Sequence, residues 1–201
     1  MPSIAWRDTR EYYGRITRLF HWLMAVLLLW QFAGMIAANL VGRAPWVSFM
    51  VGTHKSTGTL LMLLIVLRSA WGLYNLSHRP PHDRGAELLI GFGQLLLYLL
   101  MILVPLLGLT MTWASGRSLE VLGVRLMDSG GQMSGLAELT ANWHVWMAWT
   151  LGVLITGHVL LAVVWHGIIR RDHTLEKMAT RPTSHALTSH SATPRSKSGQ
   201  K

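Results

Sequence analysis

Four long apolar segments constrain this chain more than any other feature of its sequence. They run over about residues 19–41, 51–74, 88–113 and 143–169. No charged residue lies between Arg18 and Arg43, so the first segment is uninterrupted. A helix needs about 20 apolar residues to cross about 30 Å of hydrocarbon. Because a spanning helix satisfies its own backbone hydrogen bonds, the sequence predicts an all-α integral membrane protein, a four-helix bundle.

The composition agrees with a membrane protein and excludes several kinds of site. Hydrophobic residues make up 51% of the 201 residues and charged residues only 13%, far from the mix of a soluble domain. There is no cysteine, which excludes disulfides, iron–sulfur ligation and covalent haem attachment through Cys-x-x-Cys-His. The net charge of +9 does not indicate a nucleic-acid partner, because the basic residues lie between apolar segments and in the tails.

The distribution of Lys and Arg predicts the orientation in the membrane. Basic residues precede the first segment, follow the second and follow the fourth: Arg7, Arg10, Arg15, Arg18, Arg79, Arg84, Arg170, Arg171, Lys177, Arg181, Arg195, Lys197 and Lys201. The other two loops hold only Arg43, Arg117 and Arg125. The positive-inside rule therefore predicts two cytoplasmic termini. The first segment is too long for a signal-peptide core, so we expect it to be a true span.

Three regions are expected along the chain. Residues 1–17 form a cytoplasmic N-terminal segment, residues 18–178 the transmembrane domain, and residues 179–201 a disordered cytoplasmic tail rich in Ser, Thr and His. The polar, Gly-rich stretch 115–142 lies before the fourth span and could carry a short surface helix. Pro105 lies inside the third span, where a membrane helix tolerates it as a kink.

Four histidines fall well inside the predicted spans, where a polar side chain is costly and indicates function. A fifth, His166, lies at the cytoplasmic end of the fourth span, where we interpret it as an interfacial side chain and not as a ligand. His21 lies near the cytoplasmic start of the first span, and His54 near the periplasmic start of the second. The fourth span carries His144 at its start and His158 fourteen residues later. Fourteen residues of helix cover about 21 Å and return to nearly the same face. The topology therefore pairs His54 with His144 near one face of the membrane and His21 with His158 near the other.

Each residue also has a simpler interpretation. A single histidine near a membrane interface is more often an interfacial side chain than a metal ligand. The two depth-matched pairs together favour ligation, because imidazole pairs from facing helices are a common way to hold a haem iron inside a bundle. Arg68 lies fourteen residues after His54, and it is either a partner for a haem propionate or an arginine that reaches to the membrane surface. Lys55 is a second candidate for propionate binding, or for attracting a small anion.

The chain resembles the bacterial cytochrome b561 family, the small four-helix di-haem cytochromes of the inner membrane. The likeness spans about residues 15–178. Its marks are Arg18-Leu19-Phe20-His21-Trp22, His54-Lys55-Ser56-Thr57-Gly58 with Arg68, Leu97-Tyr98-Leu99-Leu100, Pro105-Leu106-Leu107-Gly108, Trp143-His144, Gly157-His158 and Arg171-Asp172-His173-Thr174-Leu175. Many relatives have a histidine where this chain has Gln94, so no role of that histidine transfers to this chain.

The resemblance implies two non-covalent b haems with bis-histidine ligation by His21, His54, His144 and His158. It also implies a bacterial inner-membrane location and electron transfer to ubiquinone within the lipid bilayer. Some relatives are superoxide oxidases, so superoxide:ubiquinone oxidoreductase is a candidate activity. Two other hypotheses stay open at this point. One is a haem-bearing anchor that couples a redox partner protein, a dehydrogenase or hydrogenase, to the quinone pool; the other is a histidine-containing transporter without haem.

Overall fold

The computed structural model describes residues 6–9, 13–75, 87–121 and 123–163, with the backbone alone at 87–90. Its elements, in chain order, are α1 (Arg15–Leu40), α2 (Pro45–Gly52), α3 (His54–Tyr74), α4 (Glu87–Ala114), β1 (Leu119–Val121), β2 (Val124–Met127) and α5 (Ser134–Leu160). The predicted tail 179–201 and the end of the fourth apolar segment lie outside the described residues.

Four stretches are long and apolar enough to span a membrane, which confirms the predicted four-helix membrane fold. They are Arg15–Leu40, Pro45–Tyr74, Gly91–Ala114 and Ser134–Val163. Large apolar side chains on their surfaces are exposed, for example Leu29 at 72% and Val153 at 70%. Lipid would cover such side chains in a membrane.

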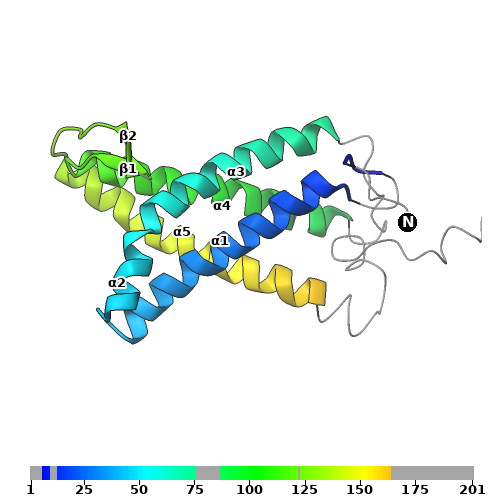
Figure 1. Cartoon of the computed structure of the whole chain (residues 1–201), viewed down its shortest axis with the longest axis horizontal. Coiled ribbons are helices and arrows are strands. Elements are labelled where there is room, and N and C mark those ends of the chain that lie inside the picture. The colour runs from blue at the N-terminus through cyan, green and yellow to red at the C-terminus, as the bar shows by residue number, and fades with distance from the viewer. Residues whose placement is uncertain (1–5, 10–12, 76–86, 122, 164–201) are drawn as a thin grey trace, which may run out of the picture.

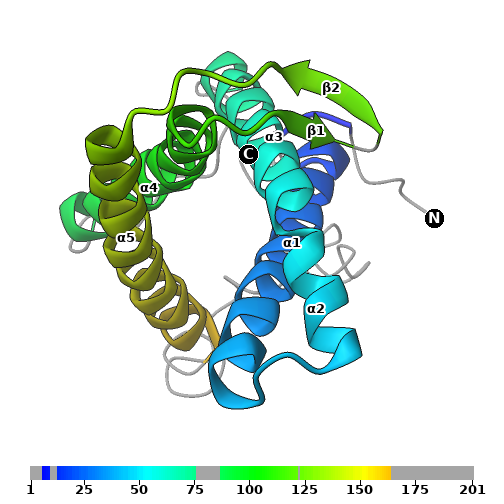
Figure 2. The ribbon, with the colours of Figure 1, turned by 90° about the vertical axis from the view of Figure 1, so that its left-hand side faces the viewer.

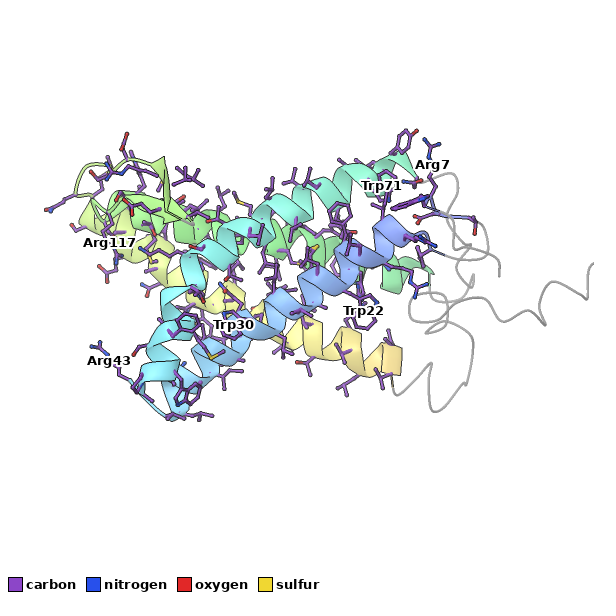
Figure 3. The ribbon with its side chains drawn as sticks, viewed as in Figure 1. Arg7, Trp22, Trp30, Arg43, Trp71 and Arg117 are labelled. Atoms are coloured by element: carbon purple, nitrogen blue, oxygen red, sulfur yellow. The ribbon has the colours of Figure 1, made fainter. Side chains whose placement is uncertain are left out.

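The long helices run alternately up and down (Figure 1). The start of α1, the end of α3, the start of α4 and the end of α5 lie at one end, which we call the terminal end. The α1–α2 connection and the β1–β2 hairpin lie at the other, which we call the hairpin end. Among the labelled side chains, Arg7 and Trp71 lie at the terminal end, and Arg43 and Arg117 at the hairpin end (Figure 3).

The second span is interrupted, which differs from the single apolar run that we expected from about residue 51. Helix α2 starts at Pro45, and α3 follows after Thr53. Proline is favoured in the first turn of a helix because it lacks the backbone N–H that would have no acceptor within the helix at that position. The helical stretch therefore begins earlier than its most apolar part. The interruption makes His54 the first residue of α3.

The stretch 115–142, which could have carried a short surface helix, holds β1, β2 and the first residues of α5. The two strands form an antiparallel hairpin in which Glu120 pairs with Arg125. Gly123 adopts a positive φ of 81°, a conformation that suits a tight hairpin turn. Helix α5 begins at Ser134, nine residues before the expected start at 143. Residues 134–142 are more polar than the rest of this span but include good helix formers, so the helix begins before its most apolar part.

The core consists of two clusters of buried side chains. Met24 of α1 packs with Leu61, Leu64 and Ile65 of α3, and Leu100 and Val104 of α4 pack with Leu151 of α5. Helix α3 also packs against α4, whereas α5 makes only sparse backbone contacts with α1 and α3. Seen from the hairpin end, α1 lies beside α3 and α4 beside α5 (Figure 2). The molecule therefore has two helix pairs, α1–α3 and α4–α5, which are joined where α3 packs against α4 and have few backbone contacts between α1 and α5.

Candidate functional site

The structure brings the four intramembrane histidines together in the two pairs that their spacing predicts. At the hairpin end, the ring centroids of His54 on α3 and His144 on α5 are 6.0 Å apart. At the terminal end, those of His21 on α1 and His158 on α5 are 6.4 Å apart. Helix α5 thus contributes one histidine to each pair.

These separations fit two imidazoles on opposite sides of one metal ion. A metal–imidazole bond is about 2 Å long and each ring nitrogen lies about 1 Å from the ring centroid, so the centroids should be about 6 Å apart. Within the described residues, no group of three or more His, Cys, Asp or Glu side chains could hold a metal ion. Each pair can therefore supply two axial ligands only, and a planar macrocycle such as haem would supply the rest.

The ring of His144 is fixed by α4. Its Nδ1 lies 2.8 Å from the carbonyl oxygen of Val104, and since a carbonyl only accepts, Nδ1 carries the proton. The lone pair of the neutral ring is then on Nε2, the atom available for a metal. A Cβ atom at Gly108 would lie 3.1 Å from Cε1 of this ring, closer than ordinary van der Waals contact. A residue larger than glycine would therefore crowd the ring in its present position.

His54 is fixed through its main chain. The side-chain Nε2 of Gln31 on α1 donates a hydrogen bond to the carbonyl oxygen of His54, at 3.1 Å. At the terminal end, His21 packs edge-on against Trp22, with ring centroids 5.4 Å apart. Within the described part of the chain, the rings of His21 and His158 form no hydrogen bond.

Arg68 is half-buried at the terminal end, next to the second histidine pair. Its Nε donates to the hydroxyl of Tyr98 at 3.1 Å, and one terminal nitrogen donates to the carbonyl of Thr17 at 3.5 Å. Its charge acts electrostatically on both His21 and His158. Arg68 is thus held by two hydrogen bonds beside this pair.

A buried carboxylate, which sequence analysis did not predict, supports the position of Arg68. Asp8 is 3% exposed. Its Oδ1 accepts hydrogen bonds from the backbone N–H of Gly14 at 2.8 Å and the hydroxyl of Thr17 at 2.7 Å. The hydroxyl oxygen of Thr17 in turn accepts from the indole N–H of Trp71 at 3.0 Å. This network joins the N-terminal segment to α1 and α3.

The basic residues at the hairpin end divide into two groups. Lys55 is exposed beside His54, and its positive charge is repelled by that of Arg117. Arg125 instead forms an ion pair with Glu120 at 3.3 Å, and both side chains are more than half exposed. Lys55 lies beside His54, and Arg117 lies close enough to Lys55 to act on its charge, so these two cations at the hairpin end could attract an anion.

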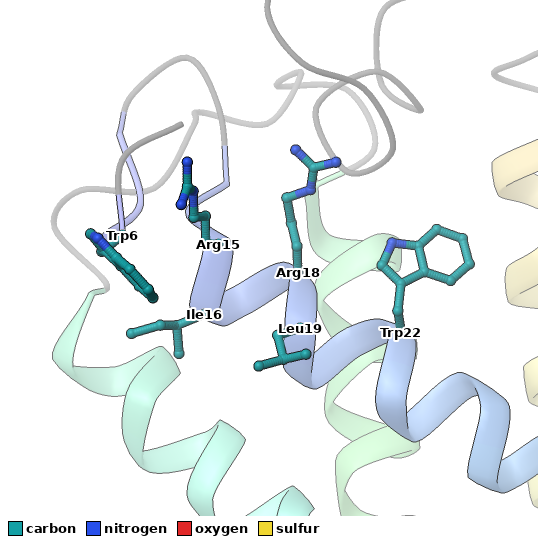
Figure 4. A pocket seen from close by; sticks show the side chains of 6 residues that line it. All are labelled: Trp6, Arg15, Ile16, Arg18, Leu19 and Trp22. Atoms are coloured by element: carbon teal, nitrogen blue, oxygen red, sulfur yellow. The ribbon is translucent and has the colours of Figure 1, made fainter. Parts of the chain in front are cut away.

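A pocket of about 410 Å³ lies on the outer surface of α1 at the terminal end (Figure 4). It is lined by Trp6, Arg15, Ile16, Arg18, Leu19 and Trp22. Trp22, at one side of the pocket, also packs against His21. The sequence did not reveal this pocket, because it forms where the N-terminal segment returns onto α1.

Comparison with known proteins places the chain in one family. The family model described as prokaryotic cytochrome b561 matches residues 12–181. Cytochrome b561 homolog 2 of Escherichia coli (strain K12) is 31% identical, over 90% of this chain and 98% of that protein. The probable superoxide oxidase CybB of Yersinia pestis is 23% identical, over 79% of this chain and 90% of that protein. The chain therefore belongs to the prokaryotic cytochrome b561 family.

Proposed function

We propose that this protein is a di-haem b cytochrome that transfers electrons across a bacterial inner membrane. Family membership implies a b-type haem. The observation that carries the proposal is the pair of facing histidines at each end of the bundle, with centroid separations of 6.0 and 6.4 Å. His54 and His144 would hold one haem, and His21 and His158 the other.

Each haem, when bound, would accept and release one electron at a time. The protein's own residues hold the ligands at two depths and place a positive charge beside one pair. The helices that carry these ligands are long and apolar enough to span a membrane. If both histidines of a pair hold the iron, no ligand position would be left for a small oxidant or reductant, which would then exchange electrons with the bound haem without binding to its iron. This favours an electron carrier.

Ubiquinone is the proposed electron acceptor. The surface pocket at Trp22 supports this proposal, since it lies on the outer face of a membrane-spanning helix and directly beside His21. A lipid-soluble quinone could reach it from within the bilayer. With both termini in the cytoplasm, as the Lys and Arg distribution predicts, this pocket would lie near the cytoplasmic surface.

Superoxide is a proposed donor at the opposite end. One relative is named a probable superoxide oxidase, and Lys55 and Arg117 supply positive charge near the His54–His144 pair. Positive charge at a site raises the encounter rate of an anion. The alternative, a haem-bearing anchor for a partner dehydrogenase or hydrogenase, has no such supporting observation.

The proposal is tested by purifying the protein and its histidine variants. We expect a reduced b-type spectrum with two haems per chain. His144→Ala should remove the hairpin-end haem, His158→Ala the terminal-end haem, and the double variant both. His185→Ala is the matched control, because it lies beyond the residues that match the family. A colourless protein, or full haem content in the double variant, would contradict the proposal.

The same preparation separates the carrier from the anchor. Mixing the purified protein with superoxide and a soluble quinone should produce quinol without any added protein. Failure to do so, together with copurification of a dehydrogenase or hydrogenase, would instead favour the anchor.

A further inference from the structure

Helix α4 has no histidine in either pair, yet two of its residues enclose the ring of His144. The carbonyl of Val104 accepts the Nδ1–H of that ring at 2.8 Å. Gly108 follows four residues later, and a Cβ atom there would lie 3.1 Å from Cε1 and 3.2 Å from Nδ1 of the ring. Because the Cα–Cβ bonds of a helix tilt toward its N-terminus, a side chain at position i+4 covers the carbonyl of residue i. Glycine at 108 leaves the Val104 carbonyl open.

The same arrangement occurs a second time, on α3. The carbonyl of His54 accepts a hydrogen bond from Nε2 of Gln31 at 3.1 Å. Four residues later stands Gly58, whose Cβ would lie 3.4 Å from that nitrogen. We call each combination of an open carbonyl and a glycine four residues later a carbonyl–glycine notch. Each notch receives a side-chain N–H from a neighbouring helix.

Both notches serve the hairpin-end pair. One fixes the ring of His144, and the other fixes the main chain of His54 at the first turn of α3. The terminal-end pair has no equivalent in the described part of the chain: His21 and His158 form no ring hydrogen bond, and a Cβ at Gly157, next to His158, would meet no atom within 4 Å. The two pairs therefore differ in how firmly the protein holds them.

We infer that the two carbonyl–glycine notches are positioning devices for the hairpin-end haem, with Gly108 as the decisive residue. This inference rests on the proposed ligation by His54 and His144. The Val104 notch selects the ring tautomer whose Nε2 is free for iron, and it sets the ring plane. A hydrogen bond from the far nitrogen of a ligating histidine to a carbonyl also makes the ligand more basic, which favours ferric over ferrous iron.

The test is a redox titration combined with low-temperature EPR of the haem-loaded protein. Gly108→Ala should push the His144 ring aside, shift the EPR signal of the hairpin-end haem and raise its midpoint potential. The terminal-end haem should not change. Gly93→Ala is the matched control on the same helix, because a Cβ at that position meets nothing within 4 Å. The single-haem variants His144→Ala and His158→Ala assign each signal to its site.

Gln31→Leu tests the second notch without adding an atom at either glycine, and it remains informative if Gly108→Ala does not fold. It should shift the hairpin-end signals alone. Gly58→Ala should have a smaller effect than Gly108→Ala, because a 3.4 Å contact with a movable amide is tolerable.

Two outcomes overturn the inference. One is a hairpin-end haem with wild-type EPR and potential in both Gly108→Ala and Gln31→Leu. The other is an equal shift of both haems. If His144→Ala retains the hairpin-end haem, the proposed ligation itself is wrong, which is a different result from an unchanged Gly108→Ala.

Discussion

The ring of His144 faces that of His54 across the hairpin end, and the two ring planes are 73° apart. The planes of His21 and His158 are 61° apart. Both pairs are thus closer to perpendicular than to parallel. The EPR anisotropy of ferric haem with two imidazole ligands increases as the ligand planes approach perpendicular.

The first prediction follows from these angles. Both haems should give strongly anisotropic low-spin EPR signals, and the hairpin-end haem should give the more anisotropic of the two. Spectra of His144→Ala and His158→Ala, each retaining one haem, provide the assignment. A rhombic signal typical of parallel imidazole planes at either site would contradict the ring geometry.

The second prediction concerns Arg68, which is half-buried beside the His21–His158 pair. A nearby positive charge favours the reduced haem, so Arg68→Gln should lower the midpoint potential of the terminal-end haem. Loss of about 1 kcal/mol corresponds to about 40 mV for a one-electron couple. The hairpin-end potential should stay unchanged in a spectroscopic redox titration.

Lys55→Gln is the matched comparison for Arg68→Gln. Lys55 lies next to His54 but is exposed, and solvent and salt screen an exposed charge. Its removal should move the hairpin-end potential less than Arg68→Gln moves the terminal-end potential. The opposite order would contradict the stronger electrostatic effect that we assign to the half-buried Arg68.

The third prediction concerns the buried carboxylate of Asp8, which is 3% exposed. Asp8→Ala leaves the N–H of Gly14 and the hydroxyl of Thr17 without their acceptor. Leaving a buried polar group unpaired costs about 1–3 kcal/mol, so the apparent Tm in detergent should fall.

Glu120→Gln provides the control for Asp8→Ala. It breaks the exposed ion pair with Arg125, and such pairs contribute at most about 1 kcal/mol. Thermal unfolding of both variants, followed by tryptophan fluorescence, should show a clearly larger decrease for Asp8→Ala. Equal melting temperatures would exclude a stabilising role for the Asp8 network.

The fourth prediction tests the pocket as a quinone site. Leu19→Trp should fill part of the pocket and slow quinone reduction, while the haem spectra stay unchanged. Leu29→Trp is the matched control, since Leu29 lies on the same helix, is 72% exposed and does not line the pocket. The measurement is the rate of haem oxidation by a soluble quinone in stopped flow. Equal rates in the two variants would place the quinone elsewhere.

The spans and the histidine pairs could be predicted from the sequence, because both depend on spacing. Apolar length sets the number of crossings, and the fourteen residues between His144 and His158 set the two depths. The start of α5 could not be predicted, since hydropathy reports where the hydrocarbon ends and not where the helix ends. The hairpin was missed because its strands have only three and four residues.

The hydrogen bond that holds the ring of His144 could not be predicted from the sequence either. Its acceptor is a backbone carbonyl forty residues away, and every residue has a carbonyl. The only trace was Gly108, and a glycine in a membrane helix is equally consistent with ordinary helix packing. Distinguishing the two required the position of the ring.

The arrangement of the helix pairs has a consequence for biosynthesis. Helix α5 packs on α4 and scarcely touches α1 and α3 through its backbone, although it faces a histidine on each of them. If iron joins those histidines, one cofactor would cross-link the last span to the first, and the other would cross-link it to the second. Assembly of the bundle would then be complete only after haem binds. In cells that lack haem, α5 would not be linked to α1 and α3, and membrane proteases would degrade the protein faster.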